Sequence, residues 1–274
     1  MNRPQYAKFG GLLILCVLGE LCAPGAAFGQ LGAPPAGPPL PAKKGALIDV
    51  TGYWASIISV DWRWRMMTPP IGDFSSVPLN QEGIRLTRAW DPKVDEARGA
   101  QCKAYGAAGL MRLPEELQIQ WADDETLLIQ TDTGMQTREL HFRGHWSGGE
   151  STTQGYSSAS WFKQTQTVGF NPPSNGPKPG RGGTLRVLTS HMLPGYLRRN
   201  GVPYSGSAAM TEYFDRIDDE GTSYLIVTSV VEDPVYLRDI FITTEEFMKM
   251  PDAARWDPQP CKIIPPTSTS QITG

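Results

Sequence analysis

Hydrophobic and polar residues alternate along many short stretches of this chain. At 117–121, a leucine, an isoleucine and a tryptophan would share one face of a strand, and two glutamines would share the other. Short turns lead on to similar stretches at 126–132 and 135–142, which predicts a meander of three antiparallel strands. The same type of pattern predicts further strands at 47–59, 155–162, 183–192, 208–217, 223–233 and 237–247.

Helix signals are few and gather in one insertion at 68–114. Asn80 is a candidate N-cap for a helix at 80–90, and Asp91-Pro92 has the order of an N-cap followed by the first helical residue for a second short helix within 91–111. Many short strands with close turns are typical of a sandwich or a barrel. We predict a mainly β fold, an antiparallel β-barrel of about nine strands with a short helical insertion.

The first residues have the features of a signal peptide. Arg3 and Lys8 precede an apolar run at 11–21, and Ala27-Phe28-Gly29 is a cleavage site before Gln30. A membrane anchor is the alternative, but the apolar run is short and ends at a glutamate. We expect cleavage near Gly29, export to the periplasm or the medium, and no transmembrane segment in the mature chain.

Composition divides the remaining chain. Residues 30–46 are rich in proline, glycine and alanine and predict an extended linker. A single barrel-like domain is expected at 47–264, and a flexible polar tail at 265–274. The chain has 25 basic and 28 acidic residues. Without clustered lysine and arginine we expect no nucleic-acid partner.

The chain has four cysteines, and two of them, Cys16 and Cys22, belong to the predicted signal peptide. Cys102 and Cys261 remain. In an oxidising compartment they predict one disulfide, and two free thiols are the alternative. Neither cysteine has a partner at C-x-x-C spacing, which argues against a zinc site.

Several motifs carry a resemblance to known proteins. They are GYLRRNGVPYS with TEYFDR, EDPVYL, QCKAYG, WADDETLLIQTDTGMQTR and WRWRM. Together they are similar to a family of exported bacterial proteins of unknown function, which implies export and a β-rich fold but no activity. Gly52 and Trp54 form a G-x-W that resembles the first strand of lipocalins. This implies a lipocalin-like or calycin-like barrel, from which the helical insertion departs.

Catalytic signals are sparse, and a G-x-S-x-G motif is missing. His141 or His191 with Glu212 are the candidates for acid–base catalysis. His141, His145 and His191 could also converge on a metal with Glu139 or Glu212, or they could be three isolated imidazoles. We expect neither a metal nor a cofactor, and whether the protein is an enzyme stays open.

The loop at 193–205 is the main candidate for ligand contact. Two tyrosines flank two arginines there, a combination that offers aromatic surface, hydroxyls and a fork for an anionic group. The alternative is a structural loop whose tyrosines pack on the barrel end and whose arginines pair with Glu212 or Asp215. The candidate ligand-binding residues are Tyr196, Arg198, Arg199, Tyr204, Glu212, Arg216, Trp54 and Trp161.

Three functions therefore stay open. The first is an exported protein that binds a small amphipathic or hydrophobic ligand in the barrel cavity. The second is an envelope enzyme that uses acid–base residues in the same cavity. The third is a structural or interaction domain without a ligand. An aromatic cavity would favour the first, a buried His–Glu pair the second and a solidly packed barrel the third.

Overall fold

Buried and exposed side chains alternate along the strands, and this alternation builds the core. In β3 (Thr126–Thr131), Leu127, Ile129 and Thr131 are buried, and the residues between them are partly exposed. The computed structural model describes residues 40–162 and 184–268. Because one set of side chains from each strand faces inward, the strands can close around a common core.

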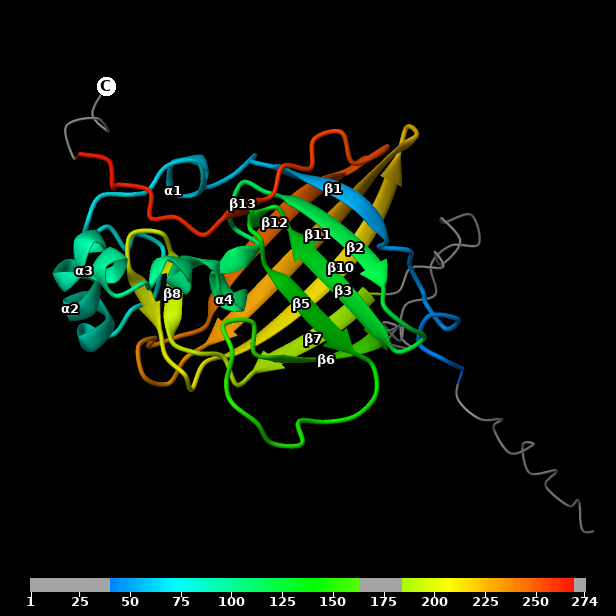
Figure 1. Ribbon diagram of the computed structural model, residues 1–274, viewed down its shortest axis with the longest axis horizontal. Helices are drawn as coiled ribbons and strands as arrows, with labels where there is room; N and C mark the ends of the chain where they lie inside the picture. The colour runs from blue at the N-terminus through cyan, green and yellow to red at the C-terminus, as the bar shows by residue number, and fades with distance from the viewer. Residues whose placement is uncertain (1–39, 163–183, 269–274) are drawn as a thin grey trace, which may run out of the picture. The chain divides into compact units, whose positions relative to one another are not determined.

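Nine strands in the described part of the chain form a closed barrel (Figure 1). The predicted mainly β barrel of about nine strands is therefore confirmed. The ring follows the order of the chain, and β12 closes it against β1. In this order the strands are β1 (Gly52–Ile57), β2 (Glu116–Trp121), β3, β5 (Thr137–His141), β6 (Tyr156–Phe162), β7 (Thr184–Ser190), β10 (Ala209–Asp219), β11 (Thr222–Glu232) and β12 (Phe241–Met250).

One strand pair differs from the antiparallel prediction. β5 and β6 run parallel, with Leu140 opposite Ser157, whereas the other neighbouring pairs of the barrel are antiparallel. A closed ring with an odd number of strands cannot alternate direction all the way round, so at least one pair must be parallel. The connection at 142–155 lies between these two strands and brings the chain back to the end where β5 began.

The barrel interior is filled by side chains. A continuous apolar cluster runs through it and includes Trp54, whose indole Nε1 donates to the Val50 carbonyl at 2.8 Å. Contributions come from every barrel strand, and fully buried members are Trp54, Leu117, Leu127, Ile129, Leu140, Leu185, Val187, Phe214, Leu225, Val227 and Phe247. This part of the barrel is a packed core.

A polar layer separates this core from a second apolar cluster. Along β10, Met210 belongs to the second cluster, Glu212 to the polar layer and Phe214 to the barrel core. The same order recurs along β12. Phe241 belongs to the second cluster, Glu245 to the polar layer and Phe247 to the barrel core. On both strands, buried carboxylates therefore lie between the two apolar clusters.

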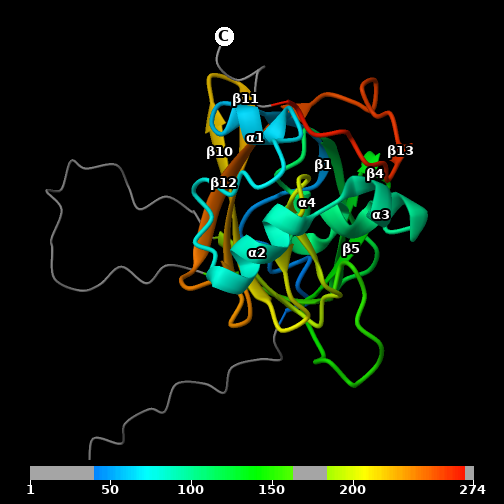
Figure 2. The ribbon, with the colours of Figure 1, turned by 90° about the vertical axis from the view of Figure 1, so that its left-hand side faces the viewer.

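The helical insertion covers one end of the barrel (Figures 1 and 2). Asn80 caps the first predicted helix as expected, because its side chain accepts a hydrogen bond from the Gly83 N–H at 3.0 Å. Asp91 caps the next in the same way. The helical elements are α1 (Trp62–Arg65), α2 (Gln81–Ala89), α3 (Pro92–Ala97), the 3₁₀ helix η1 (Gln101–Tyr105) and α4 (Ala107–Leu110).

The helical segment predicted within 91–111 is divided into three pieces. Gly99 has a φ of 67° and follows α3, a conformation that ends the helix. Gly106 is extended, with φ −72° and ψ 159°, and separates η1 from α4. The insertion therefore bends around the barrel end instead of crossing it as one rod.

The loop predicted at 193–205 contains a hairpin of its own. Its strands are β8 (Gly195–Arg198) and β9 (Val202–Tyr204), which pair antiparallel around a turn at Asn200-Gly201. The predicted turn is correct, but the two short strands around it were not expected. β8 packs against η1 and α4, and β9 packs against α2, so the hairpin and the insertion form one structure.

The predicted disulfide between Cys102 and Cys261 is present, with the two Cα atoms 5.1 Å apart. It ties η1 to the segment that follows β13 (Gln259–Pro260). That strand pairs in parallel with β4 (Thr133–Gly134). The end of the chain is thus fastened to the insertion by a covalent bond and a short ladder.

The folded part begins earlier than predicted. Residues 40–46, assigned to the linker from composition, form turns at the barrel end, where the Ala42 carbonyl accepts a hydrogen bond from Trp161 Nε1 at 2.9 Å. At the other end of the chain, Thr267 donates to the Thr68 carbonyl through its N–H and its hydroxyl. The predicted signal peptide at 1–29, the linker up to residue 39 and the tail beyond 268 lie outside the described residues. Within those residues, each helix is too short or too polar to span a bilayer.

Candidate functional site

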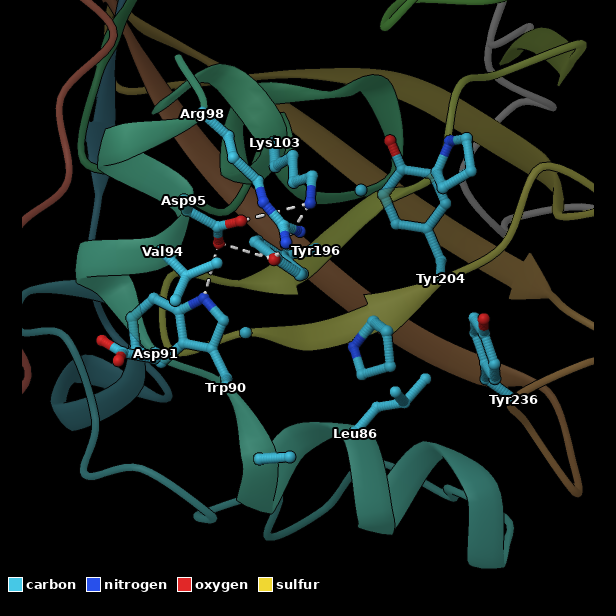
Figure 3. Close-up of a pocket in the computed structure, with 15 residues that line it drawn as sticks. Leu86, Trp90, Asp91, Val94, Asp95, Arg98, Lys103, Tyr196, Tyr204 and Tyr236 are labelled. Atoms are coloured by element: carbon cyan, nitrogen blue, oxygen red, sulfur yellow. Dashed lines mark hydrogen bonds and ion pairs between the residues drawn. The ribbon is translucent and has the colours of Figure 1, made fainter. Parts of the chain in front are cut away.

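A pocket of about 340 Å³ lies between the insertion and the β8–β9 hairpin (Figure 3). One wall comes from α2 and α3, and the other comes from the hairpin and the segment at Tyr236. Its volume lies in the lower range of small-molecule sites. Because the barrel core is filled, this pocket offers more room for a ligand than the barrel interior does.

Local sequence features hold the two walls in place. The chain leaves α2 at Trp90, and Asp91-Pro92 starts α3 at once, so the indole of Trp90 is held in the bend between the helices. On the opposite wall Gly201 has a φ of 80°. A Cβ built there would lie 2.1 Å from Trp90 Cγ. The turn can approach the indole this closely only because residue 201 is glycine.

Asp95 organises the polar end of the pocket. Its carboxylate accepts hydrogen bonds from Trp90 Nε1 at 2.8 Å, Tyr196 OH at 2.6 Å and Lys103 Nζ at 3.2 Å. Figure 3 shows these groups converging from α3, η1 and β8. The charge of this buried carboxylate is therefore already balanced within the protein.

The tyrosine in this group stays protonated. Burial raises the pKa of Tyr196, and its hydrogen bond to Asp95 raises that pKa further. The phenol therefore acts as a hydrogen-bond donor to Asp95 at neutral pH. Lys103 Nζ lies over the Tyr196 ring, 5.4 Å from the ring centre. The Trp90 ring meets the Tyr196 ring edge-on, with the two ring centres 6.3 Å apart.

Arg98 places a guanidinium at the rim of the pocket. It follows α3 directly, is exposed, and reaches toward Tyr196 and Lys103 in Figure 3. Within residues 40–162 and 184–268, its guanidinium lies in none of the ion pairs shorter than 4.0 Å. A ligand with an anionic group could therefore gain a fork-shaped partner without displacing an internal carboxylate.

The remaining walls are apolar or aromatic. Tyr204 and Tyr236 face Trp90 across the pocket, and Leu86 lies at its floor in Figure 3. Val94 is 42% exposed although it is apolar. Polar groups at one end and rings and aliphatic chains at the other are the arrangement expected for an amphipathic ligand.

The predicted ligand-binding residues do not all meet here. Tyr196 and Tyr204 line the pocket together. Arg198 and Arg199 line a smaller cavity with Trp64, and Arg199 also lines a second small cavity with Trp90, Asp95 and Tyr196. Arg198 therefore lies in a different space from the two tyrosines, whereas Arg199 reaches a cavity that Tyr196 also lines.

The other four predicted contacts are elsewhere. Trp54 and Glu212 are fully buried inside the barrel. Arg216 binds Asp218 and Ser223 at the β10–β11 hairpin, which Figure 1 shows away from the helices. Trp161 lines a separate cavity of about 240 Å³ with Trp121, Lys43 and residues 46–50. None of the four lines the pocket described above.

The candidate catalytic residues also lie apart. Glu212 bonds to Arg138 inside the barrel. His141 stacks on Tyr156 with ring centres 5.0 Å apart, and His191 stacks on Trp146 at 4.4 Å. The imidazoles therefore belong to aromatic stacks outside the barrel core.

Metal-binding geometry is likewise not found in the part of the chain that the structure describes, where no three His, Cys, Asp or Glu side chains gather as a metal site would require. His145 is exposed and lies in the connection between β5 and β6.

The residues around the polar end of the pocket were not predicted as ligand contacts from the sequence: Trp90, Asp95, Arg98 and Lys103. We expected these residues to lie on or near helices. We did not expect Asp95 to contact Tyr196, because the two residues are 101 positions apart in the sequence. An amphipathic pattern can assign a residue to a helix, yet it does not say which distant loop the helix will face. The clearest available signal was the N-cap pair Asp91-Pro92, which places Trp90 at a sharp bend.

Comparisons with known proteins give no family assignment: no family model matches the chain, and neither a curated protein nor a solved structure matches it.

Proposed function

We propose that this chain is an exported binding protein that holds a small amphipathic ligand in the pocket between the insertion and the β8–β9 hairpin. The observation that carries the proposal is the pocket itself, with aromatic and aliphatic walls and a polar end built around Asp95. The closed barrel, with Gly52 and Trp54 on its first strand, then serves as the scaffold, and in this proposal it is a lipocalin-like one.

The ligand has an anionic head in this proposal. Asp95 is occupied by three donors, so it has little capacity left for a cationic ligand. Arg98 at the rim has no such commitment to a carboxylate in the described residues, and Lys103 stands beside it. The rings of Trp90, Tyr204 and Tyr236 would cover the apolar body.

Export is supported by the Cys102–Cys261 bond, since structural disulfides persist in oxidising compartments. The proposal expects the mature chain to begin at Gln30. Intact mass measurement of the protein recovered from the periplasm or the medium tests this directly. A chain recovered there with Met1 still attached would contradict the cleavage.

Binding can be tested with an anionic and a neutral fluorescent probe. The anionic probe is 1-anilinonaphthalene-8-sulfonate, and the neutral one is N-phenyl-1-naphthylamine. We expect saturable binding of both to the full chain. Leu86→Trp fills the floor of the pocket and should abolish it. Arg85→Trp adds the same side chain on the exposed side of α2 and should leave binding intact.

A substitution of Arg98 tests whether the pocket recognises the anionic head group. Arg98→Met should weaken the sulfonate probe about tenfold, which corresponds to about 1.4 kcal/mol, and leave the neutral probe unchanged. Equal binding to wild type and Leu86→Trp would place the ligand outside this pocket. If neither probe binds the folded wild type, the ligand-free structural domain becomes the better account.

A further inference from the structure

Five arginines gather beside the pocket, on the other side of the β8–β9 hairpin. We call them the arginine cluster: Arg63 and Arg65 of α1, Arg112 after α4, and Arg198 and Arg199 at the hairpin turn. Arg65 Nε donates to the Arg112 carbonyl at 3.0 Å, and Arg199 donates to the Arg65 carbonyl. Three segments far apart in sequence thus bring like charges together.

Arg198 is the least satisfied member of the cluster. It is 4% exposed, and its guanidinium stacks on the Trp64 ring at 4.6 Å from the ring centre. All three of its side-chain nitrogens are shielded from solvent, and among the described residues they find no hydrogen-bond acceptor. Burial and, to a smaller extent, the charge of Arg112 lower the pKa of Arg198 to about 10, so the group stays charged at pH 7.

Nearby carboxylates are already engaged by other donors. Asp61 accepts from Arg112 at 3.1 Å, and Asp73 accepts from Trp64 Nε1 at 3.1 Å. Glu245 lies 2.9 Å from Arg65 and 3.2 Å from Arg112.

Arg63 is exposed, so solvent screens its charge. Even with all three carboxylates ionised, the other four arginines face three negative charges. Burial raises the pKa of Glu115 well above its usual range, so the neighbouring Glu115 does not supply the missing negative charge. The buried and half-buried arginines of the cluster therefore carry an excess of positive charge in a poorly hydrated place, which is costly unless an anion balances it.

A small cavity lies where the anion is needed. Arg112, Arg198 and Arg199 line it, and Trp64, Leu113 and Leu197 complete most of its wall. Its free space is about 10 Å³, which accepts one particle of about the size of a water molecule. A phosphate, a sulfate or a carboxylate ligand has several heavy atoms and does not fit that space.

We propose that this cavity binds one monatomic anion, chloride under ordinary conditions, through the guanidinium of Arg198 with Arg112 and Arg199 around it. The ion would hold the hairpin turn against α1 and the end of α4, and so would stabilise the wall that carries Tyr196. The site is separate from the pocket and does not depend on the proposed function.

Bromide makes the site visible in a crystal of the wild-type chain. Crystals grown in sodium bromide in place of chloride should show an anomalous difference peak within hydrogen-bond distance of the Arg198 guanidinium. An ordered water there without anomalous signal would overturn the proposal. Peaks confined to surface lysines and arginines would indicate an adventitious ion only, and would overturn it as well.

Thermal unfolding tests the same site in solution. When sodium gluconate is replaced by sodium chloride at constant ionic strength, the Tm of wild type should rise in a saturable way by at least about 2 °C. Arg198→Met should lose this dependence. Arg85→Met, which removes an exposed arginine of α2, should keep it. A chloride-independent Tm for wild type, or the same rise in Arg198→Met, would rule out an anion at this cavity.

Discussion

Arg138 and Glu212 form a two-pronged ion pair across the interior of the barrel, and both side chains are completely buried. Arg138 stands on β5 and Glu212 on β10, which are separated in the sheet by β6 and β7. The hydroxyl of Thr189 accepts a further hydrogen bond from Arg138 at 3.3 Å. This ion pair in the polar layer therefore connects β5 and β10 through the barrel interior.

Removing one partner of this pair should be far worse than removing both. Arg138→Met or Glu212→Leu alone leaves a buried charge without its counterion, and we expect each to lower the free energy of unfolding by about 3–5 kcal/mol. The double variant should lose clearly less than the sum of the two. Urea denaturation of the three variants gives the coupling energy. Additive losses would show that the pair does not act as a unit.

Stability should also depend on pH through Glu115. Both of its carboxyl oxygens are buried and have no hydrogen-bond partner in the described residues, and burial raises its pKa well above the usual 4.5. The folded chain then holds this proton more tightly than the unfolded chain does. The contribution of Glu115 to stability is therefore present below pH 4.5 and is lost as the pH rises through the folded-state pKa.

Glu115→Gln isolates this effect, because glutamine cannot ionise. Relative to that variant, wild type should become less stable as the pH rises from about 4.5, the usual value for glutamate. Denaturant midpoints of the two proteins across this pH range provide the comparison. A difference that stays constant with pH would mean that Glu115 titrates alike in the folded and unfolded chains.

Substituting two glycines that have similar backbone angles distinguishes the cost of backbone strain from the cost of a side-chain clash in the pocket wall. Gly201 and Gly221 have φ values of 80° and 84°, but only Gly201 has a neighbour, Trp90, within reach of a Cβ. Gly221→Ala should cost about 1 kcal/mol from the left-handed backbone alone. Gly201→Ala should cost more, because Trp90 must move, and it should also weaken probe binding. Equal losses of stability in thermal or urea unfolding would contradict the close packing of the turn.

The disulfide should contribute strongly because it closes a long loop. Cys102 and Cys261 are 159 positions apart, and the loop-entropy argument gives a stabilisation of up to about 5 kcal/mol. The double variant Cys102→Ala with Cys261→Ala should therefore unfold at a lower urea concentration, and dithiothreitol should affect wild type but not the variant. If the reductant does not change wild-type unfolding, the disulfide does not contribute this stabilisation.

The sequence alone determined the features that depend on neighbouring residues. Alternation of side chains placed the barrel strands, Asn80 and Asp91 marked the two helix starts, and Gly201 marked a turn. These signals are local, because strand alternation has a period of two and a cap reaches only two or three residues along the chain. The cysteine pair followed because Cys102 and Cys261 were the two left after the predicted signal peptide.

Only the tertiary structure decided where the chemistry lies. The inward polar residues of β5 and β10 could have lined a cavity, but Arg138 and Glu212 meet each other and close the barrel interior. Tyr196 meets Asp95 across 101 positions of sequence, outside the barrel. Such contacts depend on how the insertion and the hairpin pack on the barrel end. A periodic pattern fixes which face of an element is buried, and it carries no information about the partner that covers that face.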